Sequence, residues 1–288
     1  MAERPEGYLG REGSKEIFVA KQINVGLWAR NGWKNPNDDL GARIGELEQA
    51  IDTAFDTIAP GVPAPAGGPH LSTLHVFVAP EYLFKRNFRD CAASNTITAY
   101  SEQDKDHILA ELSRISQSRA NFLLVPGSIF WHRILPKKHI LARKKPPQIF
   151  NTTYAFHDGK CLFAYDKMND CGELSHEIPA ESKKCSFVAG TTFGLFDCDD
   201  LRVGIETCLD HDKGMLKKNG EQVDLHIIAS NTVTFTTSHG VAKPTGFVLH
   251  ANAIQINIGN QIYRHPFAHA DNLKLTSQGM VSFGRVAI

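Results

Sequence analysis

Residues 201–211 read LRVGIETCLDH, and this stretch decides how the rest of the sequence is interpreted. Leu201, Val203 and Ile205 alternate with other residues, a period of two that predicts a strand with one buried face. Cys208 ends this strand, and α/β proteins tend to place their functional side chains where loops leave a sheet. We therefore interpret Cys208 as a candidate nucleophile rather than as one more small buried residue.

Two further predicted strands also end in reactive side chains. Glu81 ends VFVAPE (76–81), and Lys167 ends CLFAYDK (161–167). A thiol is mostly protonated at neutral pH, so a nucleophilic Cys208 needs a nearby base or cation. Glu81 and Lys167 supply both, and each makes the burial of the other less costly if they pair. Taken singly, each charge would be interpreted as an ordinary solvated residue.

The segments around these three residues alternate between strands and helices. The run 18–28 predicts a first strand, and a stripe of apolar residues from Asp38 to Ile58 predicts a helix. Ser101 and Asp104 form a capping-box pattern at the start of a second helix. Runs 74–80, 122–130 and 224–230 predict further strands, and Asp158-Gly159 and Asp199-Asp200 predict two hairpin turns. The pattern predicts an α/β layered domain.

The three strand ends lie within longer strings that occur in a fixed order. APEYLF (79–84), NTTYAFHDGKCLFAYDKM (151–168) and LRVGIETCLDH together resemble the acidic, lysine and nucleophile motifs of the nitrilase (carbon–nitrogen hydrolase) superfamily. The similarity runs from about residue 18 to residue 231. It implies a four-layer α-β-β-α sandwich in which 1–288 form one domain, with an N-terminal tail at 1–16 and a basic insertion at about 132–148.

The resemblance also implies roles for individual residues. Cys208 would attack a non-peptide amide carbon, Glu81 would act as the base, and Lys167 with the Leu209 backbone N–H would bind the oxyanion. A second glutamate is expected in the loop 168–190, where Glu181 is preferred, Glu177 stays open and Glu173 is the third acid; Gly190 matches the family's glycine after it. Asp210, in the form Cys-x-Asp, favours an amidase over a nitrile hydrolase. An acyltransferase using the same thioester, a nitrile hydrolase and a catalytically inactive binding module are the alternatives.

Composition excludes several other classes of protein. Lys and Arg total 31 and Asp and Glu total 31, so no overall field attracts nucleic acid. We find neither a long apolar run nor the apolar centre of a secretory signal, and we expect a cytoplasmic protein without a membrane partner.

The six cysteines form no CxxC pair and are expected to be free thiols. We expect no catalytic role for the cysteines other than Cys208. His211 and His226 near the nucleophile carry no assignment. No HExxH or compact His/Cys spacing occurs, so we expect no metal and no cofactor.

Two stretches depart from the family pattern. The basic insertion at 132–148 holds six Lys or Arg and no acid. It is interpreted as a solvated or dimer-edge loop, with an anion-binding rim for a carboxylate or phosphate on the substrate as the alternative. The late stretch 246–272 should hold a helix and a strand but lacks the usual arginine-rich helix. We expect a small-molecule amide substrate, which could carry an anionic group, and a homodimer or higher homo-oligomer.

Overall fold

The computed structural model describes residues 21–30, 39–58, 73–87, 91, 96–135, 146–172, 185–253, 260–267, 275–278 and 280–288. Two β-sheets form the centre of this structure. The larger sheet has the strand order β14-β15-β1-β2-β4-β6-β5-β3, and β7 and β8 also pair with β6. Its strands are β1 (Gln22–Trp28), β2 (Thr73–Val78), β3 (Tyr100–Ser101), β4 (Phe122–Val125), β5 (Ser128–Arg133), β6 (Gln148–His157), β7 (Lys160–Asp166), β8 (Ser186–Phe187), β14 (Thr276–Gln278) and β15 (Val281–Ala287).

The smaller sheet contains the strand that leads to Cys208. Its order is β13-β12-β11-β10-β9, with β10, β11 and β12 parallel and the outer strands antiparallel to their neighbours. The parallel strands are buried along nearly their whole length, as expected for strands covered on both faces. The bounds are β9 (Gly194–Cys198), β10 (Leu201–Thr207), β11 (Val223–Ser230), β12 (Ala242–Asn252) and β13 (Gln261–Arg264).

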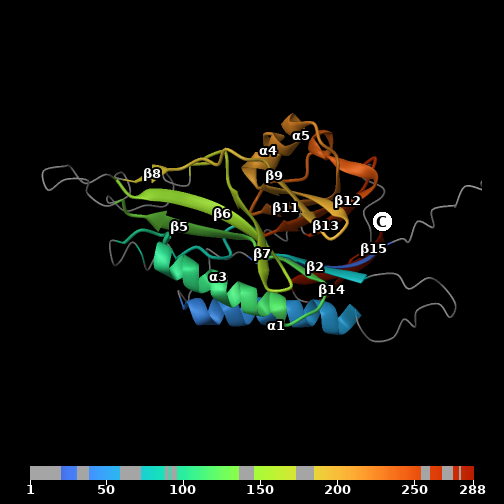
Figure 1. The fold of residues 1–288 in the computed structure, drawn as a ribbon, viewed down its shortest axis with the longest axis horizontal. Helices are drawn as coiled ribbons and strands as arrows, with labels where there is room; N and C mark the ends of the chain where they lie inside the picture. Colours follow the sequence, from blue (N-terminus) through green and yellow to red (C-terminus); the bar gives the residue numbers. More distant parts are fainter. Residues whose placement is uncertain are drawn as a thin grey trace, which may run out of the picture.

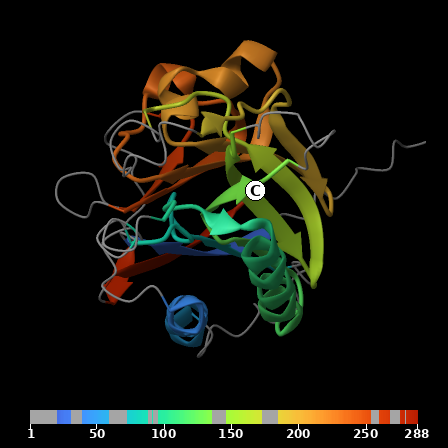
Figure 2. The same ribbon diagram turned by 90° about the vertical axis from the view of Figure 1, so that its left-hand side faces the viewer.

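Helices cover the outer face of each sheet, so the molecule has four layers (Figures 1 and 2). Two long helices, α1 (Leu40–Ile58) and α3 (Glu102–Gln117), lie against the larger sheet. The short elements α4 (Leu209–Asp212), α5 (Met215–Asn219) and η3 (Thr237–His239) lie on the smaller sheet. The expected α-β-β-α sandwich is therefore confirmed. No helix in the described part of the chain is long and apolar enough to cross a membrane.

Two apolar cores hold these layers together. Between the sheets, fully buried residues from both faces interdigitate, among them Val25, Leu123, Val203, Ile227 and Leu249. A second core fills the space under the two long helices and includes Leu47, Ile51, Phe77, Ile108 and Leu112. Burial of this kind is worth roughly 1.5–3 kcal/mol for each large aliphatic side chain. The stripe expected between Asp38 and Ile58 thus faces the larger sheet.

Most of the expected elements are present. The helix at 38–58 is α1, and Ser101 caps α3 with the reciprocal Ser101–Asp104 bonds of a capping box. The two hairpins turn at Asp158-Gly159 and at Asp199-Asp200. Run 122–130 is not one strand, because Gly127 adopts φ 74° after Pro126 and separates β4 from β5. The helix expected in the late stretch is also not found among the described residues of 246–272, whose regular elements are β12 and β13.

Parts of other expectations fall outside the described residues. These are the tail at 1–16 and residues 136–145 of the basic insertion. At the start of that insertion, Arg133 ends β5 and pairs with Glu102, with 2.6 Å between Nη2 and the carboxylate. Its guanidinium also lies 5.3 Å from the centre of the Trp131 ring. Arg133, one of the six basic residues of the insertion, therefore contacts other residues of the domain.

Gly127 fixes the loop that carries Glu81. A Cβ atom at Gly127 would come within 2.0 Å of the Pro80 carbonyl oxygen, and the φ of +74° at Gly127 is one that L side chains rarely adopt. Ser128, the next residue, accepts a hydrogen bond from the Tyr82 N–H at 3.0 Å through its hydroxyl. The break between β4 and β5 therefore allows the turn at residues 80–82 to pack directly against the sheet.

We predict that Gly127→Ala lowers the free energy of unfolding by about 1–3 kcal/mol through backbone strain, plus the cost of moving Pro80. Gly45→Ala is the matched control, since Gly45 is exposed in α1 and a Cβ there would meet nothing within 4 Å. That control should gain about 1 kcal/mol from helix propensity. Urea unfolding of both variants checks the opposite signs, and an unchanged Gly127→Ala would contradict the close packing.

Candidate active site

Glu81 lies in the turn that follows β2. Tyr82 has φ 62°, which reverses the chain, and the Phe84 N–H bonds to the Ser128 carbonyl at 3.2 Å. From α1, the buried Arg43 donates through Nη1 to the Leu83 carbonyl at 2.9 Å. The Glu81 side chain is fully buried as a result. The turn is thus held from the sheet below and from the covering helix.

Lys167 directly follows β7. Its N–H donates to the Asn151 carbonyl at 2.8 Å, and its own carbonyl accepts from the Gly190 N–H at 2.9 Å. A Cβ at Gly190 would come 2.0 Å from the Asp166 carbonyl, so this glycine allows the chain to pass against the lysine strand. The Lys167 side chain has no exposed surface. Its direction into the protein is therefore fixed by backbone on both sides.

Cys208 occupies the sharp turn between β10 and α4. Its φ of 48° and ψ of −106° lie in a region that residues with a Cβ rarely adopt. The Cys208 N–H bonds to the Ala229 carbonyl of β11 at 3.0 Å, and its carbonyl accepts from the His211 N–H at 3.0 Å. Such strain costs on the order of 1–3 kcal/mol and clusters at functional positions. The turn directs the thiol away from the strand, and Cys208 is 4% exposed.

The structure brings the three residues together, although they lie far apart in the sequence. Lys167 Nζ is 2.8 Å from Glu81 Oε1, and Asn151 Nδ2 donates to the same oxygen at 3.0 Å. Both charged groups act on the Cys208 thiol, since Glu81 raises the pKa of that thiol and Lys167 lowers it. All three side chains are buried. A carboxylate, an ammonium and a thiol thus share one enclosed space.

The charge state of this cluster follows from its burial. Desolvation, and then the Glu81 carboxylate, raise the pKa of the Cys208 thiol well above its usual range, while Lys167 opposes the rise. The resting thiol is therefore neutral at neutral pH. Any attack by this thiol would need a neighbouring base to take its proton as the new bond forms.

Cys171 is a residue of this site that sequence reasoning missed. Its Sγ lies 3.3 Å from Lys167 Nζ and 3.6 Å from the Tyr82 hydroxyl. The thiol is exposed, whereas the three clustered side chains are not. A position four residues after a lysine carries no motif of its own, so nothing in the sequence separated Cys171 from the other thiols. It lies on the solvent side of the lysine.

Asp210, in α4, joins the turn that holds Cys208 (the nucleophile loop) to residues 165–169 around Lys167 (the lysine loop). One of its carboxylate oxygens accepts from the Tyr165 hydroxyl at 2.7 Å and from the Met168 N–H at 2.9 Å. The other oxygen accepts from the backbone N–H and the side chain of Asn169, at 2.9 Å and 2.7 Å. The Cys-x-Asp spacing marked this residue, but its role as a clamp is visible only in the folded chain.

A second buried cluster supports α4 from the outer face of the smaller sheet. Glu206 Oε2 is 2.9 Å from both His211 Nδ1 and His226 Nε2, and Oε1 accepts from the Leu216 N–H at 2.6 Å. Burial raises the pKa of Glu206, but the bonds from the two histidines outweigh it and lower that pKa to about 2. The carboxylate therefore stays charged and binds β10, β11, α4 and α5 to one another.

Glu206, His211 and His226 have the composition of a metal site, but hydrogen bonds already fix which nitrogen of each histidine ring carries a proton. His211 Nε2 accepts from the Thr236 N–H at 3.0 Å, and His226 Nδ1 accepts from the Val241 N–H at 3.5 Å. Each ring must therefore carry its proton on the nitrogen that faces Glu206. A cation there would displace those protons towards nitrogens that face backbone donors. The residues fit a hydrogen-bonded clamp better than a metal centre.

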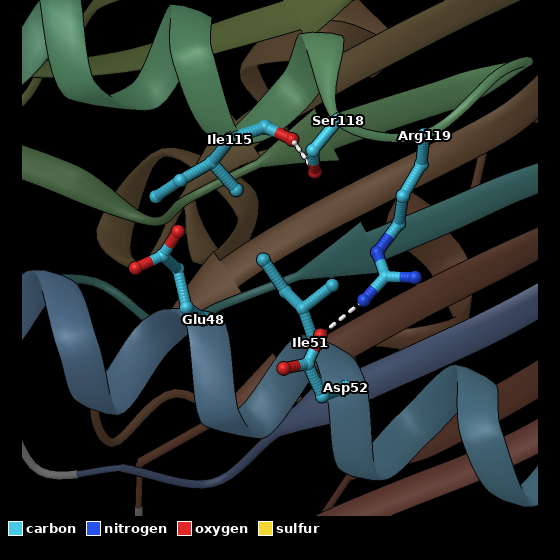
Figure 3. Close-up of a pocket in the computed structure, with 6 residues that line it drawn as sticks. All are labelled: Glu48, Ile51, Asp52, Ile115, Ser118 and Arg119. Atoms are coloured by element: carbon cyan, nitrogen blue, oxygen red, sulfur yellow. Dashed lines mark hydrogen bonds and ion pairs between the residues drawn. The ribbon is translucent and has the colours of Figure 1, made fainter.

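The remaining expected residues are placed as follows. Leu209 is the first residue of α4, directly after the thiol. Glu173, Glu177 and Glu181 all lie outside the described residues. Away from the cluster, a surface hollow between α1 and α3 is lined by Glu48, Ile51, Asp52, Ile115, Ser118 and Arg119 (Figure 3). The ion pair of Arg119 with Asp52 spans that hollow.

Comparison with known proteins gives matches only among solved structures. Neither protein-family models nor curated protein sequences match the chain. Saccharomyces cerevisiae Nit3, a member of branch 10 of the nitrilase superfamily, superposes with a TM-score of 0.58 at 16% identity, over 92% of this chain and 90% of Nit3. A mutant of the Nesterenkonia AN1 amidase from the nitrilase superfamily gives a TM-score of 0.55 at 15% identity, over 93% and 90% of the two chains. A double mutant of that amidase in complex with acrylamide gives 0.55 at 14%, over 96% and 93%. This chain therefore has the fold of the nitrilase superfamily.

Proposed function

We propose that the protein belongs to the nitrilase superfamily and hydrolyses a non-peptide amide through a thioester on Cys208. The observation that carries the proposal is the buried contact of Glu81 with Lys167, at 2.8 Å, which lies close enough to Cys208 for both groups to shift the pKa of its thiol. Burying an ion pair is costly and seldom serves stability alone. Its position beside a strained cysteine gives it a chemical use.

In the proposed reaction Glu81 moves the protons. It takes the thiol proton as Cys208 attacks the amide carbon, and it returns that proton to the nitrogen as the amine leaves. It then activates a water molecule, which attacks the thioester and releases the acid. The hydrogen bond from Asn151 to Oε1 fixes the carboxylate, which supports its use in both half-reactions.

Lys167 and the backbone N–H of Leu209 would bind the oxygen that becomes negative in each tetrahedral intermediate. Backbone hydrogen bonds on both sides of Lys167 fix the position of the residue, so its ammonium need not reorganise when the negative charge develops. Preorganised donors of this kind stabilise transition states most strongly. Asp210 holds the lysine loop and the nucleophile loop together through its four hydrogen bonds. Asp210 is thus a positioning residue and is not asked to touch the substrate.

The structural neighbours support an amide as substrate. One solved form of the Nesterenkonia amidase carries the acetamide moiety of fluoroacetamide on its active-site cysteine, and it resembles this chain with a TM-score of 0.54 at 14% identity. By analogy we propose that the substrate of this chain is a small-molecule amide, either without a charged group or with an anionic group. We also propose a single domain, a homodimer or higher homo-oligomer, a cytoplasmic location and no nucleic-acid or membrane partner. Glu181, or Glu177 in its place, stays the proposed second acid.

A substrate panel separates hydrolysis from the alternatives. The purified protein is incubated with small amides and with the matching nitriles, each with and without an amine acceptor, while ammonia and acyl products are followed. Hydrolysis predicts ammonia and free acid from amides. Acyl products that appear only with the acceptor would indicate transfer, since both reactions share the thioester. No turnover with any compound would favour a binding module.

We predict that Cys208→Ala abolishes turnover of any amide that the native protein cleaves, because the nucleophile is removed with little change in volume. Circular dichroism and thermal unfolding should show an intact fold. The matched control is Cys161→Ala, since Cys161 is an exposed thiol on β7, and its kcat should stay near the native value. Activity that survives in Cys208→Ala would refute the thioester mechanism.

We predict that Lys167→Met lowers kcat on the order of a hundredfold or more with a smaller change in KM, because the lost donor acts mainly in the transition state. Alkylation of Cys208 at neutral pH should also slow, since the cation that favours thiolate is gone. Lys167→Arg should not restore the rate, because the planar guanidinium does not replace a compact ammonium.

The control for Lys167→Met is Lys160→Met, at the exposed start of the same strand. It should leave both kcat and alkylation unchanged. Should Lys167→Met instead keep native kcat and native alkylation kinetics, the lysine has no part in the reaction.

We predict that Asp210→Asn reduces both stability and rate. An amide group cannot accept from all four donors, so the Met168 N–H faces an NH₂ group, at a cost of about 1–3 kcal/mol. Lys167 then loses its fixed position, and kcat should fall more than KM rises. Asp212→Asn, at an exposed position in the same helix, should change stability by no more than about 0.5 kcal/mol. Urea unfolding and steady-state kinetics of both variants provide the comparison.

A further inference from the structure

Two hairpins, one from each sheet, meet at the end of the sandwich opposite the thiol. The β6–β7 hairpin turns at Asp158-Gly159, and the β9–β10 hairpin turns at Asp199-Asp200. On β6, Asn151 contacts Glu81 while His157 is the last residue, and six residues of strand span about 20 Å. The tips therefore form a region separate from the candidate active site.

Three side chains of different chemistry converge between these tips. The ligand atoms of His157, Cys198 and Asp199 all lie within 4.8 Å of one another, and His157 Nε2 is 3.9 Å from Asp199 Oδ1. His157 Nε2 is buried and makes no hydrogen bond to any part of the chain that the structure describes. Cys198 is 1% exposed. Because a buried ring nitrogen normally has a partner, this arrangement points to a ligand.

We propose that His157, Cys198 and Asp199 bind one Zn²⁺ ion, with water in the fourth position. Imidazole, thiolate and carboxylate together are the ligand types that zinc accepts, at about 2.0–2.3 Å from the metal in a tetrahedral arrangement. Two ligands at such distances lie roughly 3.3 Å apart, so the present separation needs only small side-chain movements. Hard cations such as Mg²⁺ and Ca²⁺ prefer oxygen ligands and would not use the thiol.

The surroundings provide the contacts that orient zinc ligands elsewhere. Asp158 Oδ2 is 3.7 Å from His157 Nδ1, on the ring edge opposite the proposed metal. Lys21 Nζ is 3.0 Å from Asp199 Oδ2 and 2.5 Å from Asp200 Oδ1, which leaves Oδ1 of Asp199 directed at the histidine. Ligating histidines and carboxylates commonly have such outer partners. Three carboxylates against one ammonium also leave the region negative enough for a dication.

Binding must displace the proton of Cys198. Burial, and then the Asp199 carboxylate, raise the pKa of this thiol to about 12, so a neutral thiol is the state without metal. Zinc bound to the thiolate releases one proton, and the apparent affinity should rise about tenfold for each pH unit near neutrality. The ion would also link β6 of one sheet to β9 of the other, and it should stabilise the folded chain by mass action.

The test uses metal content, thermal unfolding and a cobalt spectrum. Protein stripped with a chelator is titrated with Zn²⁺ and, separately, with Co²⁺ in the Cys208→Ala background, so that the candidate nucleophile contributes no thiolate. We expect one equivalent of zinc, a higher Tm with zinc, and a sulfur-to-cobalt charge-transfer band. Cys198→Ser should remove the band, and Asp199→Asn, an exposed change, should weaken zinc binding at least tenfold.

The control is Cys161→Ser, a thiol on the same β6–β7 hairpin that is not part of the group. It should keep the band and the affinity. A band that survives in Cys198→Ser, or zinc affinity that is unchanged in both Asp199→Asn and His157→Gln, would overturn the proposal. None of these readouts depends on amide hydrolysis, so failure here leaves the proposed function untouched, and the reverse also holds.

Discussion

The buried ion pair of Glu81 with Lys167 is the interaction on which the rest of the site depends. Both side chains are wholly inaccessible to solvent, and their charges are 2.8 Å apart. Removing either charge from water costs several kcal/mol, and only close geometry with further hydrogen bonds offsets that cost. The fold supplies these conditions by anchoring the two loops from below and above, through Ser128 and Arg43 for the glutamate and through Asn151 and Gly190 for the lysine. A pair so tightly constrained can hold a fixed electrostatic field around Cys208.

Contacts between the two sheets hold Cys208 close to this ion pair. The hydroxyls of Thr153 on β6 and Thr207 on β10 are 2.8 Å apart, next to the position where β10 ends at the cysteine. Asp210 adds a second connection on the far side of Cys208, and the Glu206 cluster holds α4 against its own sheet. The strained turn at Cys208 is therefore fixed from three directions. Strain of this kind persists only where the surrounding structure determines it.

The sequence was informative wherever function coincided with a local pattern. Glu81, Lys167 and Cys208 each follow a strand that the sequence pattern predicts, and the capping box at Ser101 and Asp104 is a four-residue signal. Packing between distant segments is not encoded locally, and it escaped prediction. The four bonds to Asp210 depend on how the loop after β7 faces α4 across the two sheets. The contact of Cys171 with Lys167 is local, but its spacing matches no motif. The break at Gly127 was also missed, because a run of apolar residues hides a left-handed glycine.

The pairing of β1 with β15 has a consequence for how the molecule is made. Gln22 lies opposite Ala287 and Trp28 opposite Val281, so two strands that are far apart in the sequence are adjacent in the larger sheet. Val281 follows Trp28 by 253 residues (281 − 28), so this length of chain must be synthesised before β1 acquires its neighbour. Contacts of such long sequence separation slow folding and leave an unpaired strand edge exposed in the meantime. Until β15 pairs with it, this edge of β1 could associate with strands of other molecules, and the same edge would be open in a variant that lacks β15.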